Sequence, residues 1–298
     1  MQFFFEVLIA GLLSGVMYAL VALGFVLIFK ASGVFNFAQG AMVFLAALTV
    51  AGLKDEFGFS LWAAIPVAAA VMIALGFLTE RVVLRPLVNQ HDITLFMATI
   101  GLTFFLEGLA QLVWGSTVRK LELGIEDVPF EAVMESTGML VSQFDVIAAL
   151  ICGALVAALA FLFNKTKIGR ALRAVADDHQ AALTVGIPLQ HVWGVVWAVA
   201  GIVALVAGLL WGARNGVQFA LTFVALKALP VLILGGFTSV PGAIVGGLII
   251  GASEKLAEVF IGPYVGGGIE GWFPYVLALL FLLVRPEGLF GEKIIRRI

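Results

Sequence analysis

Long apolar runs separated by short polar connections dominate the chain. Several runs exceed the roughly 18 apolar residues that mark a transmembrane helix. The pattern therefore predicts an all-α polytopic membrane protein with about eight or nine transmembrane helices. The expected spans are residues 3–29, 34–53, 61–79, 93–114, 144–163, 191–213, 221–240, 242–261 and 272–285.

The seventh expected span, residues 221–240, is irregular. Its sequence LTFVALKALPVLILGGFTSV contains Lys227, Pro230 and the pair Gly235-Gly236. Interrupted backbone at membrane depth is tolerated only where protein or a water-filled cavity covers it. We therefore expect this segment to be broken or re-entrant rather than a straight crossing.

Basic residues predict which connections face the cytoplasm, because cytoplasmic loops carry an excess of Lys and Arg. Bases gather in loops 80–92 and 164–190 and in the C-terminal tail, and Lys30 lies between the first two spans. Loop 115–143 instead contains five acids against two bases. We expect this loop and the N-terminus outside, with loop 164–190 and the C-terminus in the cytoplasm, a parity that nine crossings satisfy.

The composition narrows the function classes. The chain has 298 residues, of which 62% are hydrophobic and 12% charged, whereas soluble domains are about 25% charged. We expect one membrane domain over residues 1–298, and a net charge of −2 gives no indication of nucleic-acid binding. No phosphate-binding loop of the G-x-x-x-x-G-K-[ST] type occurs, and the histidines lack metal-ligand spacing. We therefore expect no catalytic centre, metal or bound cofactor.

The polar stretch NKTKIGRALRAVADDHQAALTVGI, residues 164–187, lies between two apolar runs. Ile168, Leu172 and Val175 fall at i, i+4 and i+7, which predicts one apolar helical face. The charged side chains of this short helix fall on another face: Arg170, Arg173 and Asp177.

A second short helix is expected over HQAALTV, with Asp177 or Asp178 as its cap and its end at Gly186 and Pro188. The loop has two interpretations. Its bases suit a solvated connector that carries the positive-inside signal. Its alanines, glycines and arginines equally suit a docking element, since alanine and glycine allow another protein's backbone to approach closely and arginines pair with carboxylates.

A polar stripe follows the expected span 93–114. Thr99, Thr103, Glu107 and Gln111 succeed one another every four residues, which keeps them near one helical face. Polar groups at membrane depth normally face the bundle interior or a wet cavity. The stripe is interpreted either as a wall of a translocation path or as interhelical hydrogen bonding, with Glu107 near the outer interface.

Three other polar residues in or near the expected spans also have two interpretations each. Asn36 and Gln39 either line the path or tie their helix to a neighbour, and Lys227 either belongs to the path or reaches an interface. A local i, i+3 ion pair is expected between Lys255 and Glu258. Small-residue faces predict close helix packing, within this chain or with a partner: Ala243, Gly247, Gly251 and Ala200, Ala204, Gly208, Gly212.

Several segments resemble one known family. The segment 33-GVFNFAQGAM-42 resembles the N-F-A-H/Q-G signature of the LivH-type high-affinity branched-chain amino acid permeases, although Gln39 stands where many relatives have His, so no titrating imidazole is expected there. The resemblance continues in the same order along the chain, at 80-ERVVLRPL-87, 98-ATIGL-102, 235-GGFTSVPGAIVGGLIIG-251 and 285-RPEGLFGE-292. The polar loop, from Gly169 to Ile187, resembles the cytoplasmic coupling loop of ABC-importer permeases.

This resemblance implies a permease subunit of an ATP-driven importer in the inner membrane of a bacterium, for branched-chain or other hydrophobic amino acids. The implied partners are a second permease, homologous or identical, two ATPase subunits that use ATP and Mg, and an extracytoplasmic solute-binding protein. Alternatives are a related permease for urea, short amides or aromatic acids, and an ATPase-independent transporter or channel. ATPase coupling is assigned to Gly169, Arg170, Ala171, Arg173, Ala174, Asp177, Asp178, Ala182 and Gly186.

The charge asymmetry makes the topology testable by cysteine labelling. A cysteine at Glu126 is expected to react with an impermeant thiol reagent in intact cells, and one at Ala174 is expected to be protected. The native Cys152, which lies in an apolar run, is replaced by Ser in both variants. Labelling at Ala174 without labelling at Glu126 would show that the orientation is reversed.

Overall fold

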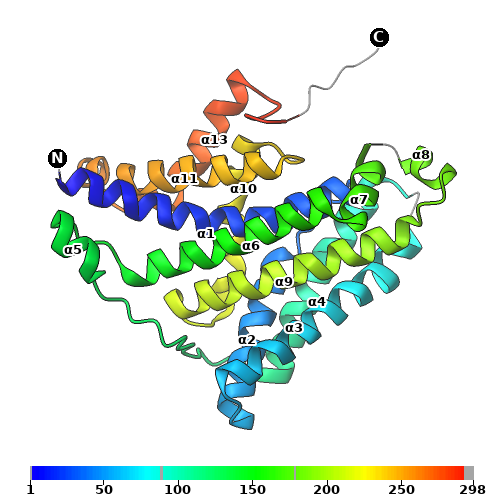
Figure 1. Cartoon of the computed structure of the whole chain (residues 1–298), viewed down its shortest axis with the longest axis horizontal. Helices are drawn as coiled ribbons and strands as arrows, with labels where there is room; N and C mark the ends of the chain where they lie inside the picture. The colour runs from blue at the N-terminus through cyan, green and yellow to red at the C-terminus, as the bar shows by residue number, and fades with distance from the viewer. Residues whose placement is uncertain (1, 88–89, 178, 292–298) are drawn as a thin grey trace. The chain divides into compact units, whose positions relative to one another are not determined.

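The computed structural model describes residues 2–87, 90–177 and 179–291. These residues form helices joined by short connections, and their extended pairing is limited to isolated bridges (Figure 1). The α-helices are α1 (Gln2–Ser32), α2 (Gln39–Phe57), α3 (Leu61–Leu78), α4 (Asp92–Trp114), α5 (Glu131–Thr137), α6 (Gln143–Lys165), α7 (Lys167–Asp177), α8 (His179–Thr184), α9 (Leu189–Asn215), α10 (Val224–Gly235), α11 (Val240–Phe260), α12 (Gly262–Val265) and α13 (Phe273–Val284). The tighter or wider turns are the π-helix η1 (Thr79–Leu84) and the 3₁₀ segments η2 (Arg85–Leu87), η3 (Phe219–Phe223) and η4 (Ile269–Gly271).

Each of the nine expected spans contains a helix, which confirms the all-α membrane architecture. Five helices are long and apolar enough to cross a bilayer, and α10 with α11 forms a pair bent by 114° that makes a sixth if counted as one span. The expected interruption near residue 235 is therefore confirmed. The bend also replaces two expected crossings by one broken or re-entrant element, so a total of eight or nine crossings stays a prediction.

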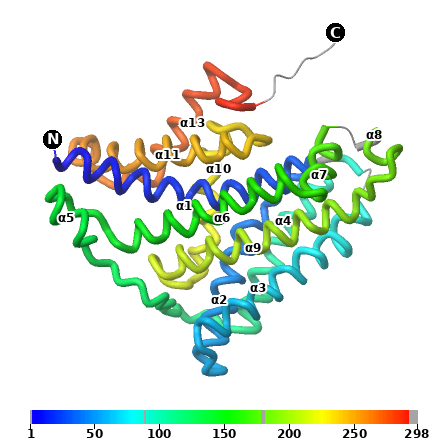
Figure 2. The backbone as a smooth tube through the Cα atoms, in the orientation of Figure 1, coloured from blue at the N-terminus to red at the C-terminus, as the bar shows by residue number. Residues whose placement is uncertain are grey.

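The chain divides into two compact units, of which the larger comprises residues 24–123 and 155–225. Within it, α9 packs against α2 and α3, and α4 packs against α2 (Figure 2). Trp197 of α9 is fully buried, and on the expected small-residue face Gly208 lies close to the Val43 backbone and Gly212 close to the Ala47 side chain. The small-residue face expected on α9 is therefore used inside this chain.

Side-chain contacts show which helix ends of this unit lie together. The Trp193 indole, at the start of α9, donates to the Ala31 carbonyl at the end of α1, 2.9 Å away. At the opposite end of α2, Arg119 of loop 115–143 pairs with Asp55 and Glu56. The first grouping joins the end of α1 to the start of α9, and the second joins the end of α2 to the loop after α4; the side of the membrane that each faces stays a prediction.

The other unit comprises residues 1–23, 124–154 and 226–298. Its α11 lies along the N-terminal part of α1 (Figure 1), where Gly247 faces the Gly15 carbonyl and Gly251 faces the Gly11 carbonyl. A side chain at Gly247 would place its Cβ only 2.6 Å from that carbonyl oxygen. The Gly247–Gly251 face therefore packs inside this chain, as small-xxx-small faces do in membranes.

Two sequence segments meet where α10 ends. The amides of Leu289 and Phe290 donate to the carbonyls of Leu234 and Gly235, 2.8 and 3.2 Å away. The Ser239 hydroxyl accepts from the Gly242 amide and caps α11. The C-terminal segment thereby satisfies helix-end carbonyls that have no partner within α10.

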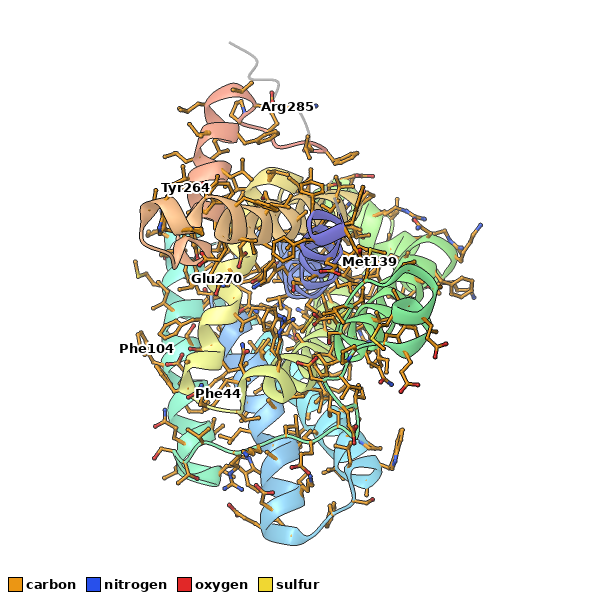
Figure 3. All side chains as sticks on the ribbon, turned by 90° about the vertical axis from the view of Figure 1, so that its left-hand side faces the viewer. Phe44, Phe104, Met139, Tyr264, Glu270 and Arg285 are labelled. Carbon is orange, nitrogen blue, oxygen red and sulfur yellow. The ribbon has the colours of Figure 1, made fainter. Side chains whose placement is uncertain are left out.

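Apolar side chains cover the outer surface of several helices. Only 17% of the most apolar window of α6 is buried, against 72% for α9. Phe104 of α4 and Tyr264 of α12 point outward and are 70% and 88% exposed (Figure 3). Such surfaces suit lipid rather than water, and the protein is an integral membrane protein.

Gly247→Ala is expected to destabilise the chain, because its methyl group would meet the Gly15 carbonyl and the Ala19 side chain. Overpacking of this kind typically costs about 1–3 kcal/mol. The melting temperature of the detergent-purified protein measures the change. Gly153→Ala, in the open surroundings of α6, is the control and should be neutral or slightly stabilising; equal melting temperatures for both variants would contradict the packing argument.

Candidate functional site

The polar loop forms the two expected short helices, α7 and α8. The Thr166 hydroxyl accepts from the Gly169 amide, 3.1 Å away, and so caps the first turn of α7. Leu172 and Val175 are buried, while Ile168, the third member of the expected apolar face, is 42% exposed. α7 packs against α9, which holds the loop on the larger unit.

Two of the residues assigned to ATPase coupling are engaged within the chain. A side chain at Gly169 would place its Cβ 2.1 Å from the Phe163 carbonyl oxygen, so this glycine is required by the α6–α7 turn itself. The Arg173 guanidinium donates to the same carbonyl at 2.8 Å and to the Asn164 side chain at 3.1 Å. The small size of Gly169 is therefore explained within this chain, and its role in ATPase coupling stays a prediction.

The remaining coupling residues divide by exposure. Arg170 and Asp177 are exposed, Ala171 and Ala174 are half-buried, and Ala182 is buried. Gly186 follows α8 with a φ of +81°, a conformation that glycine adopts readily. Asp178 lies outside the described residues, and so does its expected capping role. The exposed polar face of α7 is thus centred on Arg170.

The polar stripe of α4 forms hydrogen bonds at its N-terminal half. The Thr99 hydroxyl donates to the carbonyls of Phe35 and Phe96, and Thr103 donates to the Thr99 carbonyl. Glu107 is buried, with 8% of its surface exposed. Thr99 therefore ties α4 to the segment before α2, while Glu107 places a carboxylate inside the larger unit.

Two cavities lie at opposite ends of this stripe. One, of about 240 Å³, is lined by Gln111 together with polar loop residues and apolar side chains. The other, of about 410 Å³, is mainly apolar and lies near the start of α4. The first is lined by Phe44, Leu48, Gln111, Gly115, Ser116, Thr117, Gln218 and Phe219, and the second by Phe29, Gly33, Val34, Phe35, Ile93, Leu95 and Phe96.

Asn36 and Gln39 form a buried pair at the start of α2. The Asn36 amide donates to the Gln39 side-chain oxygen at 3.2 Å, and the Asn36 oxygen accepts from the Ala38 amide at 3.1 Å. The Gln39 amide nitrogen is buried without a hydrogen-bond partner in the described structure. The geometry fits a tie within this turn, and a role in the path stays a prediction.

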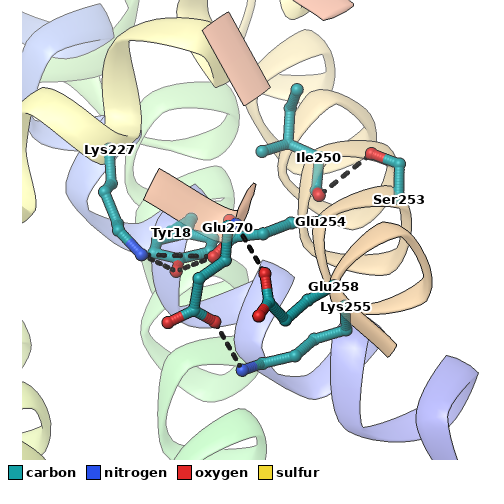
Figure 4. A network of polar contacts seen from close by, with 8 residues as sticks. All are labelled: Tyr18, Lys227, Ile250, Ser253, Glu254, Lys255, Glu258 and Glu270. Atoms are coloured by element: carbon teal, nitrogen blue, oxygen red, sulfur yellow. Dashed lines mark hydrogen bonds and ion pairs between the residues drawn. The ribbon is translucent and has the colours of Figure 1, made fainter. Parts of the chain in front are cut away.

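The polar residue Lys227 lies in the smaller unit and has two partners there. Its ammonium contacts the Glu254 carboxylate of α11 at 3.2 Å and the Tyr18 hydroxyl of α1 at 3.4 Å (Figure 4). Tyr18 also donates to Glu254 at 3.1 Å. The partners of Lys227 were not predictable from sequence spacing, because they are 27 and 209 residues away from it.

Neighbouring charges are paired separately from this cluster. Lys255 contacts Glu270 at 3.1 Å rather than forming the local pair expected with Glu258 (Figure 4). Glu258 instead accepts from the backbone amides of Gly268 and Glu270, each 2.9 Å away. The turn after α12 brings these partners together, which helical periodicity alone does not indicate.

The ion pair between Arg85 and Glu80 was also not predicted from the sequence. Arg85 donates two hydrogen bonds to Glu80, which is 1% exposed, at 2.8 and 3.1 Å. The intervening residues form the π-helix η1, whose i→i+5 repeat brings this pair onto one side. The i, i+5 spacing of opposite charges was the available signal, but it points to contact only when the turn is π-helical.

Comparisons with known proteins cover nearly the whole chain. The family model "Branched-chain amino acid transport system / permease component" matches residues 7–285. The permease protein LivH of Escherichia coli (strain K12), from a high-affinity branched-chain amino acid transport system, is 28% identical over 99% of this chain and 98% of its own. BraD of Pseudomonas aeruginosa, described in the same words, is 27% identical with the same coverage.

An archaeal relative extends the similarity. The probable branched-chain amino acid transport permease protein LivH of Methanocaldococcus jannaschii is 30% identical over 91% of this chain and 88% of its own. The residues matched by the family model, 7–285, include the polar loop and the α10–α11 bend described above. The chain belongs to the family of permease components of branched-chain amino acid transport systems.

Proposed function

We propose that the chain is the permease subunit of an ATP-binding-cassette importer for branched-chain or other hydrophobic amino acids, in the inner membrane of a bacterium. It forms the translocation path with a second permease. Two ATPase subunits bind ATP and Mg, and an extracytoplasmic solute-binding protein delivers the substrate. Similarity to LivH and BraD over 99% of the chain is the observation that carries this proposal.

The loop 164–190 is the element through which an ATPase acts on the membrane. α7 buries Leu172 and Val175 and exposes Arg170 and Lys167. The turn at Gly169 and the Arg173–Phe163 hydrogen bond fix α7 to the end of α6. A force on the exposed face of α7 is therefore transmitted directly to α6 and α9. Alternating access requires such rigid transmission.

The path within this chain follows α4. The stripe from Thr99 to Gln111 runs between the two cavities, and the cavity at Gln111 combines amide and hydroxyl groups with Phe44 and Phe219. Ligand sites commonly pair apolar walls with a few polar groups. Such a lining suits a solute with an apolar side chain and a polar main chain.

Experiments can distinguish this function from two alternatives. A permease for urea, short amides or aromatic acids would show ATP-dependent uptake of those solutes and not of leucine. A secondary transporter or channel would transport without stoichiometric ATPases in the purified complex. Leucine uptake by the reconstituted complex, with and without ATP, distinguishes all three.

Arg170→Glu and Ala174→Trp are expected to weaken ATPase co-purification or uncouple ATP hydrolysis from uptake. Overpacking a fitted contact costs about 1–3 kcal/mol, and each ~1.4 kcal/mol is tenfold in affinity. Ala158→Trp, on the exposed surface of α6, adds the same bulk away from the loop and serves as control. Normal ATPase binding and transport in the Arg170→Glu, Ala174→Trp double variant would reduce the loop to a solvated connector.

Glu107→Leu tests the path. Because Glu107 is the carboxylate of the stripe, its loss is expected to lower uptake about tenfold, or ~1.4 kcal/mol, while assembly with the ATPases stays normal. Phe104→Leu, on the exposed side of the same helix, should leave uptake unchanged. Wild-type uptake by Glu107→Leu would place Glu107 outside the path.

A further inference from the structure

The pair Lys227–Glu254 joins two apolar helices of the smaller unit, α10 and α11. Glu254 is 1% exposed, whereas a third of the Lys227 side chain is exposed. Removing charges from water is costly, and ionisable residues in membrane segments are functional candidates by default. In the second pair of this region, Lys255–Glu270, the carboxylate is more exposed, 40% against 2% for the Glu254 side chain.

Only one oxygen of the Glu254 carboxylate forms hydrogen bonds in the described structure. Oε1 receives both the Lys227 ammonium and the Tyr18 hydroxyl, while Oε2 is buried with no hydrogen-bond partner in the described structure. Lys227 has three N–H donors, and the structure gives it two acceptors, Glu254 and Tyr18. The pair thus offers one buried acceptor beside a partly exposed cation.

We infer that Lys227 and Glu254 bind the main-chain charges of a zwitterionic amino acid during transport. Glu254 Oε2 accepts from the ammonium of the amino acid, and Lys227 Nζ donates to its carboxylate. Tyr18, whose ring centre lies 5.8 Å from Nζ, keeps the cation in place. This inference rests on the proposed function and names the groups that recognise its substrate class.

Charge balance favours a zwitterion over either charged half. When a zwitterion binds, the ammonium and the carboxylate each meet an opposite charge, so no charge in the cluster is left alone. A carboxylic acid without an amino group would leave Oε2 unsatisfied, and an amine without a carboxylate would add an uncompensated positive charge. Unpaired buried charges are strongly unfavourable, so the site discriminates by the presence of both groups.

The test uses the whole importer complex in proteoliposomes with ATP and radiolabelled leucine. Lys227→Met/Glu254→Leu replaces the pair by apolar side chains of similar volume, a change that is often neutral for stability. We expect normal assembly and melting temperature but a fall in maximal uptake of about tenfold or more, that is ~1.4 kcal/mol. Lys255→Met/Glu270→Leu is the matched control, and its uptake should equal that of the wild type.

If the double variant does not assemble, the single variant Glu254→Gln tests the inference. The amide retains one oxygen for Tyr18 and Lys227 but replaces the open acceptor by a donor, so uptake should fall as in the double variant. Wild-type uptake by an assembled Lys227→Met/Glu254→Leu or Glu254→Gln complex would overturn the inference. Failure of the wild-type complex to take up leucine at all would instead overturn the proposed function.

Discussion

The absence of water in the bilayer core is the constraint on which this structure depends. Every backbone N–H and C=O group at that depth needs a partner inside the protein, and helices provide it most simply. The α10–α11 bend shows how the chain manages an exception. The carbonyls of Leu234 and Gly235 receive the amides of Leu289 and Phe290, and Ser239 caps the next helix. A segment about fifty residues downstream therefore makes the interruption tolerable.

The same constraint governs the polar side chains. The hydroxyls of Thr99 and Thr103 donate to carbonyls of their own helix, and Thr99 also donates to the Phe35 carbonyl outside it. Many charged residues lie instead in α7 and in the loops, where water or another protein can solvate them. In the smaller unit, Lys227 and the buried Glu254 are paired with each other instead.

Local patterns predicted much of this architecture. Apolar runs located the helices within a few residues, and the periodicity of 168–175 indicated α7 with its buried Leu172 and Val175. Long-range pairs were not predictable, since Tyr18 and Glu254 are 236 residues apart and neither marks the other in sequence. The contact of Gly169 was not predictable for a related reason: a small residue looks the same in sequence whether its neighbour is Phe163 of this chain or another protein.

Apolar length likewise does not separate a crossing from one arm of a bent pair, which is why the number of spans was less certain than their positions. The bend also gives the Lys227–Glu254 pair a mechanical meaning. Lys227 lies on α10 and Glu254 on α11, so the ion pair ties together the two arms of an element that is bent by 114°. A zwitterion bound at Oε2 of Glu254 and at Nζ of Lys227 would contact both arms at once. Because a ligand shifts a conformational equilibrium only through its different affinity for the two states, such a zwitterion would change the freedom of the bend only by contacting the pair more favourably in one arrangement of the arms than in the other.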